Sequence, residues 1–492
     1  MQNYINLYEA VKIVENEDIS REYLYYINNG YSQYRHREIK NLHDFLKITE
    51  ISREYAEGFL FGYEIPQLNK EFDLIKIADN LCVNVELKGG NVPLEKVRKQ
   101  LLQNQHYLKM LDKELFLCTY FANSNKFFTL KDNELIEINL EEVKSRLKIK
   151  TFKTPDLNEV FSPQNVLVSP LNNTEKFIAG KYLLTENQQN IKSTIIDLVL
   201  NNKESKFFGL TGNAGTGKTL LTFDIAKTIS KYINTLIIHG GILSDGHRLL
   251  SEKLENIVII PAKLWNVTKT DKYNLIILDE SHRIYSSTID DIRNYVIERN
   301  VHAIFSYDER QRLSNFEFNS QTVEKIKEMC ESHNYRLTNK IRTNKELALF
   351  ITCLMDLSKI ESNYTFENVE IKYIPDKIEA HKFGHYLENE RGYTFITYTP
   401  SQYNDGLGYQ DGPNNTHRVI GQEFDKVCMV LDDNFSYRDN KLVSKRHPNP
   451  DYLFHQLLYQ GLTRVRTKLF LIIRDLTILG NVLKILNNEK SI

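Results

Sequence analysis

The sequence predicts an α/β protein in which a small mixed sheet near the N-terminus precedes two lobes built on parallel sheets. Short apolar runs separated by helical patterns follow residue 181, namely "KFFGL", "NTLIIHG", "NIVII", "NLIILDE" and "HAIFSYD". A second set comprises "EIKYI", "YTFITY", "KVCMVLDD" and "KLFLIIRD". Nearly continuous apolar runs are typical of strands buried on both faces of a parallel sheet. Residues 51–150 instead follow the order α-β-β-β-α-β, which indicates a mixed sheet.

The N-terminal pattern predicts a domain over residues 1–150. A helix is expected over "ISREYAEGFLFG", and two strands around an Ala-Asp-Asn turn over "FDLIKIADNLCVNVELKGG". A long helix follows in "PLEKVRKQLLQNQHYLKMLDKEL", and then single strands in "LFLCTYFAN" and "KFFTLKDNELIEINL". Residues 151–180 concentrate Pro, Asn and Ser, which indicates an irregular linker. The two lobes are predicted at 181–335 and 336–492.

The net charge, the cysteine spacing and the apolar runs limit the classes of protein to which the chain can belong. The chain has 492 residues, a formal net charge of -1 and 26% charged residues, as expected of a globular protein rather than a basic tail. Nucleic acid would therefore bind in local grooves. The 5 cysteines form no Cys-x-x-Cys or Cys/His spacing, which argues against structural zinc and suits a reducing cytoplasm. We identify no signal peptide and no membrane-spanning run, so we expect a cytoplasmic protein.

The stretch "FFGLTGNAGTGKTLL" fits Gly-x-x-x-x-Gly-Lys-[Ser/Thr] between an apolar strand and a helical pattern, and this context indicates a P-loop that binds ATP. Backbone N–H groups and the start of the helix would face the phosphates. Lys218 would reach the β- and γ-phosphates, and the Thr219 hydroxyl would bind Mg²⁺. The predicted nucleotide-binding residues of the loop are Gly212, Asn213, Ala214, Gly215, Thr216, Gly217, Lys218 and Thr219.

A second apolar strand, in "NLIILDESHR", ends in two carboxylates. Ligands of parallel α/β sheets bind at the carboxyl ends of the strands, so both side chains should face the nucleotide. Asp279 would hold Mg²⁺ through its water shell, and Glu280 would polarise the attacking water.

Further motifs follow in an order that resembles the superfamily 1 helicases. "LLTENQQNI" is similar to the upstream Q-type motif, which implies that Gln188 reads the adenine edge. "FSYDERQRLS" resembles the third motif, in which Asp308 and Gln311 sense the γ-phosphate. "RLTNKIRTNKEL" resembles the fourth motif and implies that Arg342 is an arginine finger.

The resemblance continues in the second lobe and covers roughly residues 181–475. "THRVIGQEFDKVCMV" is similar to the fifth motif, with Thr416, Gly421, Gln422 and Glu423. "LLYQGLTRVRTKL" resembles the sixth and implies that Arg464 is a second arginine finger. The resemblance implies two RecA-like P-loop lobes, in which positive charge from the second lobe completes the γ-phosphate cage of the first.

The chain departs from that helicase pattern in two ways. Only about sixty residues separate Lys218 from Asp279, and about seventy separate Arg342 from Thr416, so large accessory domains do not fit there. The segment "HGGILSDGH" does not match the usual strand-contacting motif. The compact form resembles the helicase-like domain of Schlafen proteins and their bacterial relatives, which puts duplex unwinding in question and leaves ATPase activity as the expectation.

The two N-terminal strands resemble the Asp…Glu-x-Lys pattern of the PD-(D/E)XK nucleases, and the resemblance implies a restriction-endonuclease-like mixed sheet. Glu86 and Lys88 are two apart on one strand and so share a face, which Asp73 on the preceding strand can join. Asp73 and Glu86 would hold Mg²⁺, and Lys88 would orient or deprotonate a water. The weaker assignments are Glu57 as a third carboxylate, and Gln103 and Tyr107 as a Gln-x-x-x-Tyr element. An exposed hairpin rim with ordinary surface charges is the competing interpretation.

These patterns predict an ATP-dependent nuclease-helicase or translocase that acts on nucleic acid, with DNA favoured over RNA, and with a homo-oligomer possible. Bacterial fusions of this kind resemble antiphage immunity enzymes, while a role in cellular repair or recombination stays open. One alternative is an ATP-driven nucleic-acid-binding switch without nuclease activity. Another is a signalling module in which the ATPase lobes sense nucleotide and drive oligomer assembly.

Overall fold

The computed structural model describes much of the chain. The described residues are 4–14, 19, 22–23, 26, 36–65, 68, 70–150, 155–202, 204–268, 273–309, 311, 313, 317, 320–338, 344–360, 364–400, 412–445 and 452–489. The chain divides into two compact units, and each is considered by itself. The N-terminal unit is Met1–Val166 with Leu183–Glu186, and the C-terminal unit is Leu167–Tyr182 with Asn187–Ile492.

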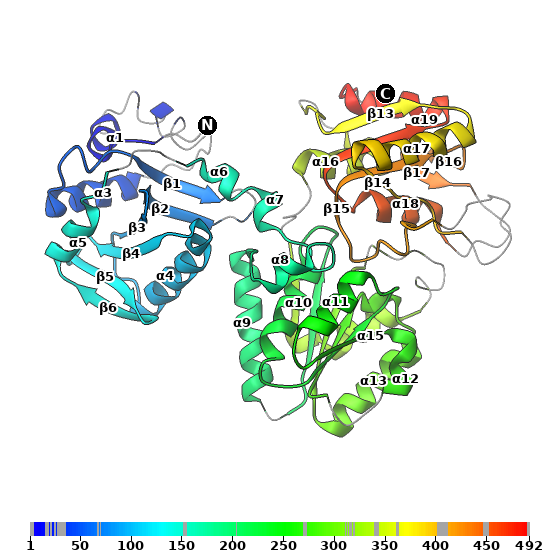
Figure 1. Cartoon of the computed structure of the whole chain (residues 1–492), viewed down its shortest axis with the longest axis horizontal. Coiled ribbons are helices and arrows are strands. Elements are labelled where there is room, and N and C mark those ends of the chain that lie inside the picture. Colours follow the sequence, from blue (N-terminus) through cyan, green and yellow to red (C-terminus); the bar gives the residue numbers. More distant parts are fainter. Residues whose placement is uncertain are drawn as a thin grey trace. The chain divides into compact units, whose positions relative to one another are not determined.

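A mixed sheet forms the centre of the N-terminal unit (Figure 1). Its strands lie side by side in chain order: β1 Phe59–Ile65, β2 Lys70–Ile77, β3 Leu81–Lys88, β4 Glu114–Phe121, β5 Lys126–Lys131 and β6 Glu134–Ile138. Strands β3 and β4 are parallel, and the other neighbours are antiparallel. The parallel pair is joined by helix α4 Leu94–Leu108 and the short turn η1 Lys109–Leu111, because a parallel connection must cross from one end of the sheet to the other.

Helices α1 Leu7–Val14, α3 His36–Thr49 and α5 Leu140–Leu147 bury their apolar stripes in one core with the sheet. Phe45 of α3 packs against Tyr120 of β4, with ring centroids 5.7 Å apart. Full burial of such side chains contributes roughly 2–3 kcal/mol each, so this core holds the sheet in place. Helix α4 directs two polar side chains, Gln100 and Asn104, toward Glu86 of β3.

Two sequence expectations for this unit are wrong. The segment "ISREYAEGFLFG" is not a helix, since residues 53–58 form a turn and β1 begins at Phe59. Gly58 has a φ of +80°, in the left-handed region that ends regular structure, and this outweighs the helical spacing of the apolar residues. The segment "KFFTLKDNELIEINL" is a hairpin rather than one strand, because Asp132 and Asn133 both adopt positive φ, as a tight turn requires.

The C-terminal unit contains two parallel sheets, as the apolar runs predict (Figure 1). The strand order of the first is β12 Asn334–Leu337, β7 Phe207–Gly212, β11 His302–Tyr307, β10 Leu275–Asp279, β8 Thr235–His239 and β9 Ile257–Pro261. The longer helices of this lobe are α9 Glu186–Asn201, α10 Lys218–Ile229, α11 Asp245–Lys253, α13 Ser286–Arg299 and α15 Thr322–Met329. Short helical segments are η2 Ala262–Leu264, α12 Trp265–Thr268, η3 Ser281–Arg283 and η4 Glu331–His333.

The second sheet has the order β13 Val369–Tyr373, β18 Val465–Ile473, β15 Phe424–Leu431 and β14 Thr394–Phe395. Its helices are α16 Lys345–Met355, α17 Lys377–Arg391, α18 Phe454–Leu462 and α19 Leu476–Leu486, with the turn η5 Leu357–Lys359. The hairpin of β16 Phe435–Arg438 and β17 Lys441–Ser444 is absent from the sequence prediction. So is the edge strand β12, which is largely exposed and lacks an apolar run.

The predicted linker contains short helices, α6 Leu157–Val160, α7 Pro163–Val166 and α8 Thr174–Ile178. The Asp156 side chain accepts from the Asn158 N–H and caps α6, a signal that the Pro- and Asn-rich composition hides. Across the described ranges, none of the helices combines the length and apolarity that a bilayer crossing requires. The cysteines are buried and unpaired, in agreement with their scattered spacing.

Candidate active sites

The P-loop lies between the end of β7 and the start of α10. Gly215 and Gly217 have φ values of +76° and +83°, which glycine adopts without the steric cost that other residues meet. A Cβ atom at Gly212 would lie 2.8 Å from the carbonyl oxygen of Leu337, so β7 approaches β12 this closely only with glycine. The loop therefore curls as a phosphate cradle does, and α10 directs its positive end into it.

Lys218 is folded into the loop. Its Nζ donates to the carbonyl oxygens of Gly212 at 2.7 Å and Asn213 at 3.1 Å. The same ammonium lies 3.1 Å from Oδ2 of Asp308, whose side chain is 2% exposed. The positive charge is thus held at the cradle by a buried carboxylate from the end of β11.

Asp279 is the last residue of β10 and Glu280 follows it, as the sequence predicts. Asp279 is buried, and its Oδ2 lies 3.1 Å from Nδ1 of His239 on the neighbouring strand β8. Glu280 has a φ of +52°, and its carboxylate lies 3.2 Å from Nε of Arg283 and 3.4 Å from Nε2 of His282. Burial alone would raise the pKa of Glu280, but its electrostatic interactions with His282 and Arg283, and then with Lys218 and Arg464, together hold that pKa well below its usual range.

Residues from the second lobe line the same pocket as the P-loop. Arg464 is buried, and its Nη2 donates to Oε1 of Gln311 at 3.3 Å. Its Nη1 donates to the carbonyl oxygen of Gln422 at 3.3 Å. The structure brings together the following lining residues: Ala214, Gly215, Thr216, Gly217, Lys218, Thr219, Glu280, Gln311, Gly421, Glu423 and Arg464.

Gln188 and Thr416, which the sequence also predicts for this site, do not line the pocket. Gln188 is buried on α9, and its Nε2 donates to the carbonyl oxygen of Thr216 at 3.0 Å, so it braces the loop. Thr416 is buried and contacts the hydroxyl of Thr399 at 2.9 Å, which makes it part of a polar turn rather than of the pocket lining. Arg342 lies outside the described residues.

Sequence reasoning missed residues that touch these groups. His282 Nδ1 accepts from the Asp308 N–H at 3.2 Å and so links the segment after β10 to the one after β11. Arg283 and His282 both lie within "NLIILDESHR", so their position beside the carboxylates was the available signal. Asn172 accepts from the Glu423 N–H at 2.8 Å, and no pattern in the predicted linker indicates this contact.

The N-terminal unit gathers a second group of charged side chains. The antiparallel pairing of β2 and β3 begins with Leu74 opposite Val85, and Asp73 and Glu86 are the next residues of the two strands beyond this pair. Lys88 Nζ lies 3.4 Å from Oε2 of Glu86 and 3.7 Å from Oδ2 of Asp73. The Glu86 side chain is 1% exposed, whereas those of Asp73 and Lys88 are 15% and 19% exposed. The ammonium thus bridges a buried and a partly accessible carboxylate.

Helix α4 reaches this group with residues other than those predicted. Asn104 Nδ2 donates to Oε1 of Glu86 at 2.8 Å, and Gln100 Nε2 donates to Oε2 of Glu86. They are four apart on the helix and therefore share a face. Gln103 has no described contact with Glu86, and the Tyr107 hydroxyl donates to the carbonyl oxygen of Leu184 at 2.6 Å.

Glu57 lies in a turn rather than on a helix, and its Oε2 accepts from Nδ2 of Asn6 at 2.8 Å. It lies near the charge of Lys76, whose place on β2 points to the opposite face of the sheet from Asp73. The structure therefore does not bring Glu57 to the other carboxylates.

The fold and the pocket of the C-terminal unit define a helicase-like P-loop ATPase. Residues 205–384 match the family model of the Schlafen group 3 DNA/RNA helicase domain. This stretch holds the P-loop, Asp279, Glu280 and Gln311. No match was found among the curated proteins.

Among solved structures, the chain is similar to the Pif1 helicase from Bacteroides in complex with ADP-AlF3 and ssDNA. The identity is 16% and the TM-score 0.31, over 60% of this chain and 92% of the other. It is also similar to nonstructural protein 10, a helicase, of an arterivirus. That identity is 14% and the TM-score 0.28, over 60% of this chain and 63% of the other.

Proposed function

We propose that the chain uses ATP hydrolysis in its C-terminal unit to move or remodel nucleic acid, and that its N-terminal unit cuts nucleic acid with Mg²⁺. The motor half rests on one observation, namely that Lys218, Glu280 and Arg464 line a single pocket around the P-loop. A pocket of opposite charges around a phosphate cradle is what phosphoryl transfer needs, because positioning and charge stabilisation supply most of that catalysis.

Four side chains would act directly on ATP or on the attacking water. Lys218 Nζ leaves the carbonyl oxygens of the loop and binds the β- and γ-phosphates. The Glu280 carboxylate, kept ionised by its cationic neighbours, accepts a hydrogen bond from the attacking water. The Arg464 guanidinium and the Gln311 amide meet the charge that develops on the γ-phosphate.

Magnesium fits the oxygen donors of the nucleotide pocket. The hydroxyl of Thr219 and the buried carboxylate of Asp279 are hard ligands of the kind this cation prefers. When bound, the ion would neutralise phosphate charge. The proposed roles of these two residues are to hold it directly and through water respectively.

Nucleic acid is proposed to bind along a groove of the first lobe. The groove is lined by Ile242, Lys263, Arg248 and Tyr285, together with neighbouring backbone, at the carboxyl ends of β8 and β9. Tyr285 and Ile242 are 62% and 56% exposed. Aromatic and apolar faces beside basic side chains suit the bases and phosphates of a single strand. Arg283 lines this groove and also contacts Glu280, which would couple strand binding to hydrolysis.

The nuclease half is supported by the geometry around Asp73, Glu86 and Lys88. The order α3, β1, β2, β3, α4, β4 reproduces the α-β-β-β-α-β pattern, with both carboxylates and the lysine on one face. Two carboxylates are suitable Mg²⁺ ligands, and the ion would supply an activated water. Because Glu86 already accepts from several donors, the ion would replace the contact of Lys88 or Gln100, and Lys88 would then face the water.

A cleavage assay tests the nuclease half. Labelled single- and double-stranded DNA and RNA are incubated with the full chain and Mg²⁺, with and without ATP. We expect wild type to cut, with DNA preferred, and Glu86→Ala to lose at least about 100-fold in rate. Glu95→Ala is the matched control, because Glu95 is an exposed carboxylate at the start of α4. Equal cutting by wild type and Glu86→Ala would remove the proposed site.

The second candidate function is an ATP-driven switch whose N-terminal unit binds nucleic acid without cutting it. One observation favours it: Oε1 of Glu86 accepts from Asn84 and Asn104 while Oε2 accepts from Gln100 and Lys88, so the carboxylate is already satisfied. Under this alternative the same assay shows binding by gel shift and no Mg²⁺-dependent product, even in wild type. Sedimentation with a non-hydrolysable ATP analogue tests the related proposal that nucleotide drives homo-oligomer assembly.

The antiphage role rests on the resemblance to bacterial nuclease-helicase fusions. It predicts that cells expressing wild type reduce phage plating, and that Glu86→Ala or Lys218→Ala restores it. Protection by Glu86→Ala equal to wild type would separate any defence role from nuclease activity.

A further inference from the structure

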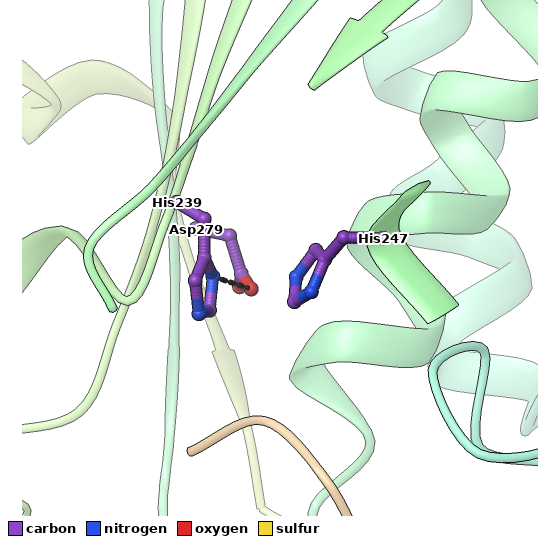
Figure 2. A group of neighbouring side chains, drawn as sticks. All are labelled: His239, His247 and Asp279. Atoms are coloured by element: carbon purple, nitrogen blue, oxygen red, sulfur yellow. Dashed lines mark hydrogen bonds and ion pairs between the residues drawn. The ribbon is translucent and has the colours of Figure 1, made fainter. Parts of the chain in front are cut away.

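The segment "HGGILSDGH", which does not match the usual strand-contacting motif, brings two histidines to Asp279. The register of β8 and β10 pairs His239 with Asp279, and His247 is the third residue of α11. One possible ligand atom of each residue lies within 4.8 Å of the other two, and all three side chains are buried. Figure 2 shows His239 and Asp279 side by side, with the His247 ring facing them from α11.

Hydrogen-bond partners define the protonation of both rings in the metal-free protein. Nδ1 of His239 lies beside a carboxylate oxygen of Asp279, so this nitrogen carries the proton and donates. Nδ1 of His247 accepts from the Ser244 N–H at 3.1 Å, so the His247 proton is on Nε2. This contact is part of the capping box of α11 and orients the ring in the metal-free protein.

Each ring leaves one nitrogen unsatisfied. Within the described part of the chain, neither Nε2 of His239 nor Nε2 of His247 has a hydrogen-bond partner, and both atoms are buried. Buried polar atoms are nearly always paired, so the unsatisfied Nε2 of His247, which lies near the Asp279 carboxylate, points to a bound species.

We propose that His239, His247 and Asp279 bind a borderline divalent transition-metal ion, with Zn²⁺ as the representative. Imidazole nitrogen and carboxylate oxygen are the ligands this class of ion takes, whereas Mg²⁺ selects oxygen. Two ligands of a tetrahedral ion stand about 3.3 Å apart, and the measured separation of Nδ1 of His239 and Oδ2 of Asp279 is 3.1 Å. Nε2 of His247 completes the site after a small rotation of its ring, with water in the fourth position.

Both histidine rings stay neutral when the ion binds, so the number of protons on each ring does not change. On binding, the proton of His239 moves from Nδ1 to Nε2, and that of His247 moves from Nε2 to Nδ1. The new Nδ1–H of His247 donates to the hydroxyl oxygen of Ser244, 3.0 Å away, and this hydrogen bond replaces the one that Nδ1 accepted from the Ser244 N–H. A hydrogen bond of this kind to the second nitrogen of a metal-bound histidine orients the ring.

An ion at this position would affect ATP hydrolysis. This effect rests on the proposed function. Asp279 is the residue proposed to hold the water shell of Mg²⁺ at the P-loop. An ion at His239 and His247 draws the same carboxylate away, so Zn²⁺ lowers the ATPase rate while leaving the P-loop intact. The site would thus be an inhibitory metal site of the motor.

Metal binding is tested on the full chain with Co²⁺, whose visible absorption reports low-coordinate nitrogen and oxygen ligands. Wild type is expected to show one saturable band that Zn²⁺ removes and Mg²⁺ does not. His239→Gln and His247→Gln are expected to weaken binding at least about 10-fold. His385→Gln is the matched control, because His385 is exposed on α17 and its substitution should leave the titration unchanged.

A spectroscopic measurement on the wild-type protein tests the metal site even if the variants fail to fold. X-ray absorption of the zinc complex should show imidazole nitrogen in the first shell. A shell of oxygen alone, a shell containing sulfur, or no saturable Co²⁺ band would overturn the site. Metal binding is measured in the absence of ATP hydrolysis, so the two proposals are tested separately. A chain that binds Co²⁺ in this way and hydrolyses no ATP would contradict the proposed function and support the metal site.

Discussion

Nε of Arg283 lies 3.2 Å from the Glu280 carboxylate, while the same side chain lines the groove at the carboxyl ends of β8 and β9. Its Nη1 also lies 3.4 Å from Glu317, and the arginine side chain is only 3% exposed. One guanidinium is therefore shared between the carboxylate proposed to activate water and the surface proposed to bind nucleic acid. A shift of Arg283 toward a phosphate of the strand would alter the charge beside Glu280.

Arg283→Gln should reduce the stimulation of ATPase activity by single-stranded nucleic acid. The neutral amide keeps part of the polar contact but removes the charge that senses phosphate, and we expect the stimulated rate to fall by about 10-fold or more. Phosphate release measured with and without oligonucleotide checks this. Arg293→Gln, on the exposed face of α13, is the control. Unaltered stimulation in Arg283→Gln would exclude the coupling.

Lys218→Ala should lower ATP turnover by at least about 100-fold, because the ammonium is the proposed contact of the transferred phosphate. The variant also leaves Asp308 buried without its cation, which should cost about 3 kcal/mol of folding free energy. Phosphate release and denaturant unfolding measure the two effects. Lys253→Ala, exposed at the end of α11, should change neither. Normal turnover in Lys218→Ala would show that the P-loop assignment is wrong.

Glu280→Gln should bind ATP and hydrolyse it slowly. The amide keeps the shape of the side chain but cannot accept a proton, so we expect a loss of about 100-fold or more in turnover with nucleotide affinity retained. Fluorescent nucleotide titration and single-turnover kinetics separate these quantities. Glu298→Gln, an exposed residue of α13, is the matched control. Full hydrolysis by Glu280→Gln would assign water activation to another group.

Acid should destabilise the C-terminal unit partly through His417. Burial lowers the pKa of His417 from 6.5 to about 4, with a further contribution from the charge of Arg283. Between these values the unfolded state binds the proton and the folded state does not, so stability is complete above about pH 6.5 and is lost as pH falls toward 4. The loss is at most about 3 kcal/mol for this group.

Thermal unfolding from pH 7 to 4 measures this dependence. His417→Gln should flatten part of the slope, while His385→Gln, which removes an exposed histidine, should leave it unchanged. His247, His282 and His302 share the direction of the pKa shift, so a residual slope is expected in His417→Gln. A slope identical to that of wild type would exclude His417 as a contributor.

The fold could be predicted where a local pattern determines the element. Strands β7, β8, β10, β11 and β15 are continuous apolar runs, and a chain buried on both faces has few other options. The strand β12 lacks such a run because much of it is exposed at the edge of the sheet. The false helix over residues 51–62 shows the converse: apolar spacing suggested a helix that Gly58 and the pairing of β1 with β2 do not allow.

The same distinction applies to the sites. The P-loop, Asp279 and Glu280 are each specified by a few consecutive residues and the strand that precedes them, so sequence alone is enough to nominate them. The contacts of Asn104 with Glu86 and of His247 with Asp279 depend on how a helix packs on a sheet. Those partners are far apart in sequence, and no periodicity identifies which residue of the helix will lie beside the carboxylate of the strand.

The contact of Asn104 allows a test that compares two neighbouring residues of α4. Its Nδ2 donates to Glu86 at 2.8 Å and to Oδ1 of Asn84 at 2.7 Å, and Asn104 is completely buried. Asn104→Ala leaves the buried Glu86 carboxylate one donor short, so the free energy of unfolding should fall by about 2–3 kcal/mol.

Gln103→Ala is the matched control for that variant, since it alters the adjacent residue, which has no described contact with Glu86. Urea unfolding at pH 7 compares the two variants. If Gln103→Ala is as destabilising as Asn104→Ala, the amide network around Glu86 does not carry the stability. If only Asn104→Ala destabilises and also alters Mg²⁺-dependent cutting, then α4 holds the proposed metal ligand in place, because Asn104 and Gln100 of this helix both donate to Glu86.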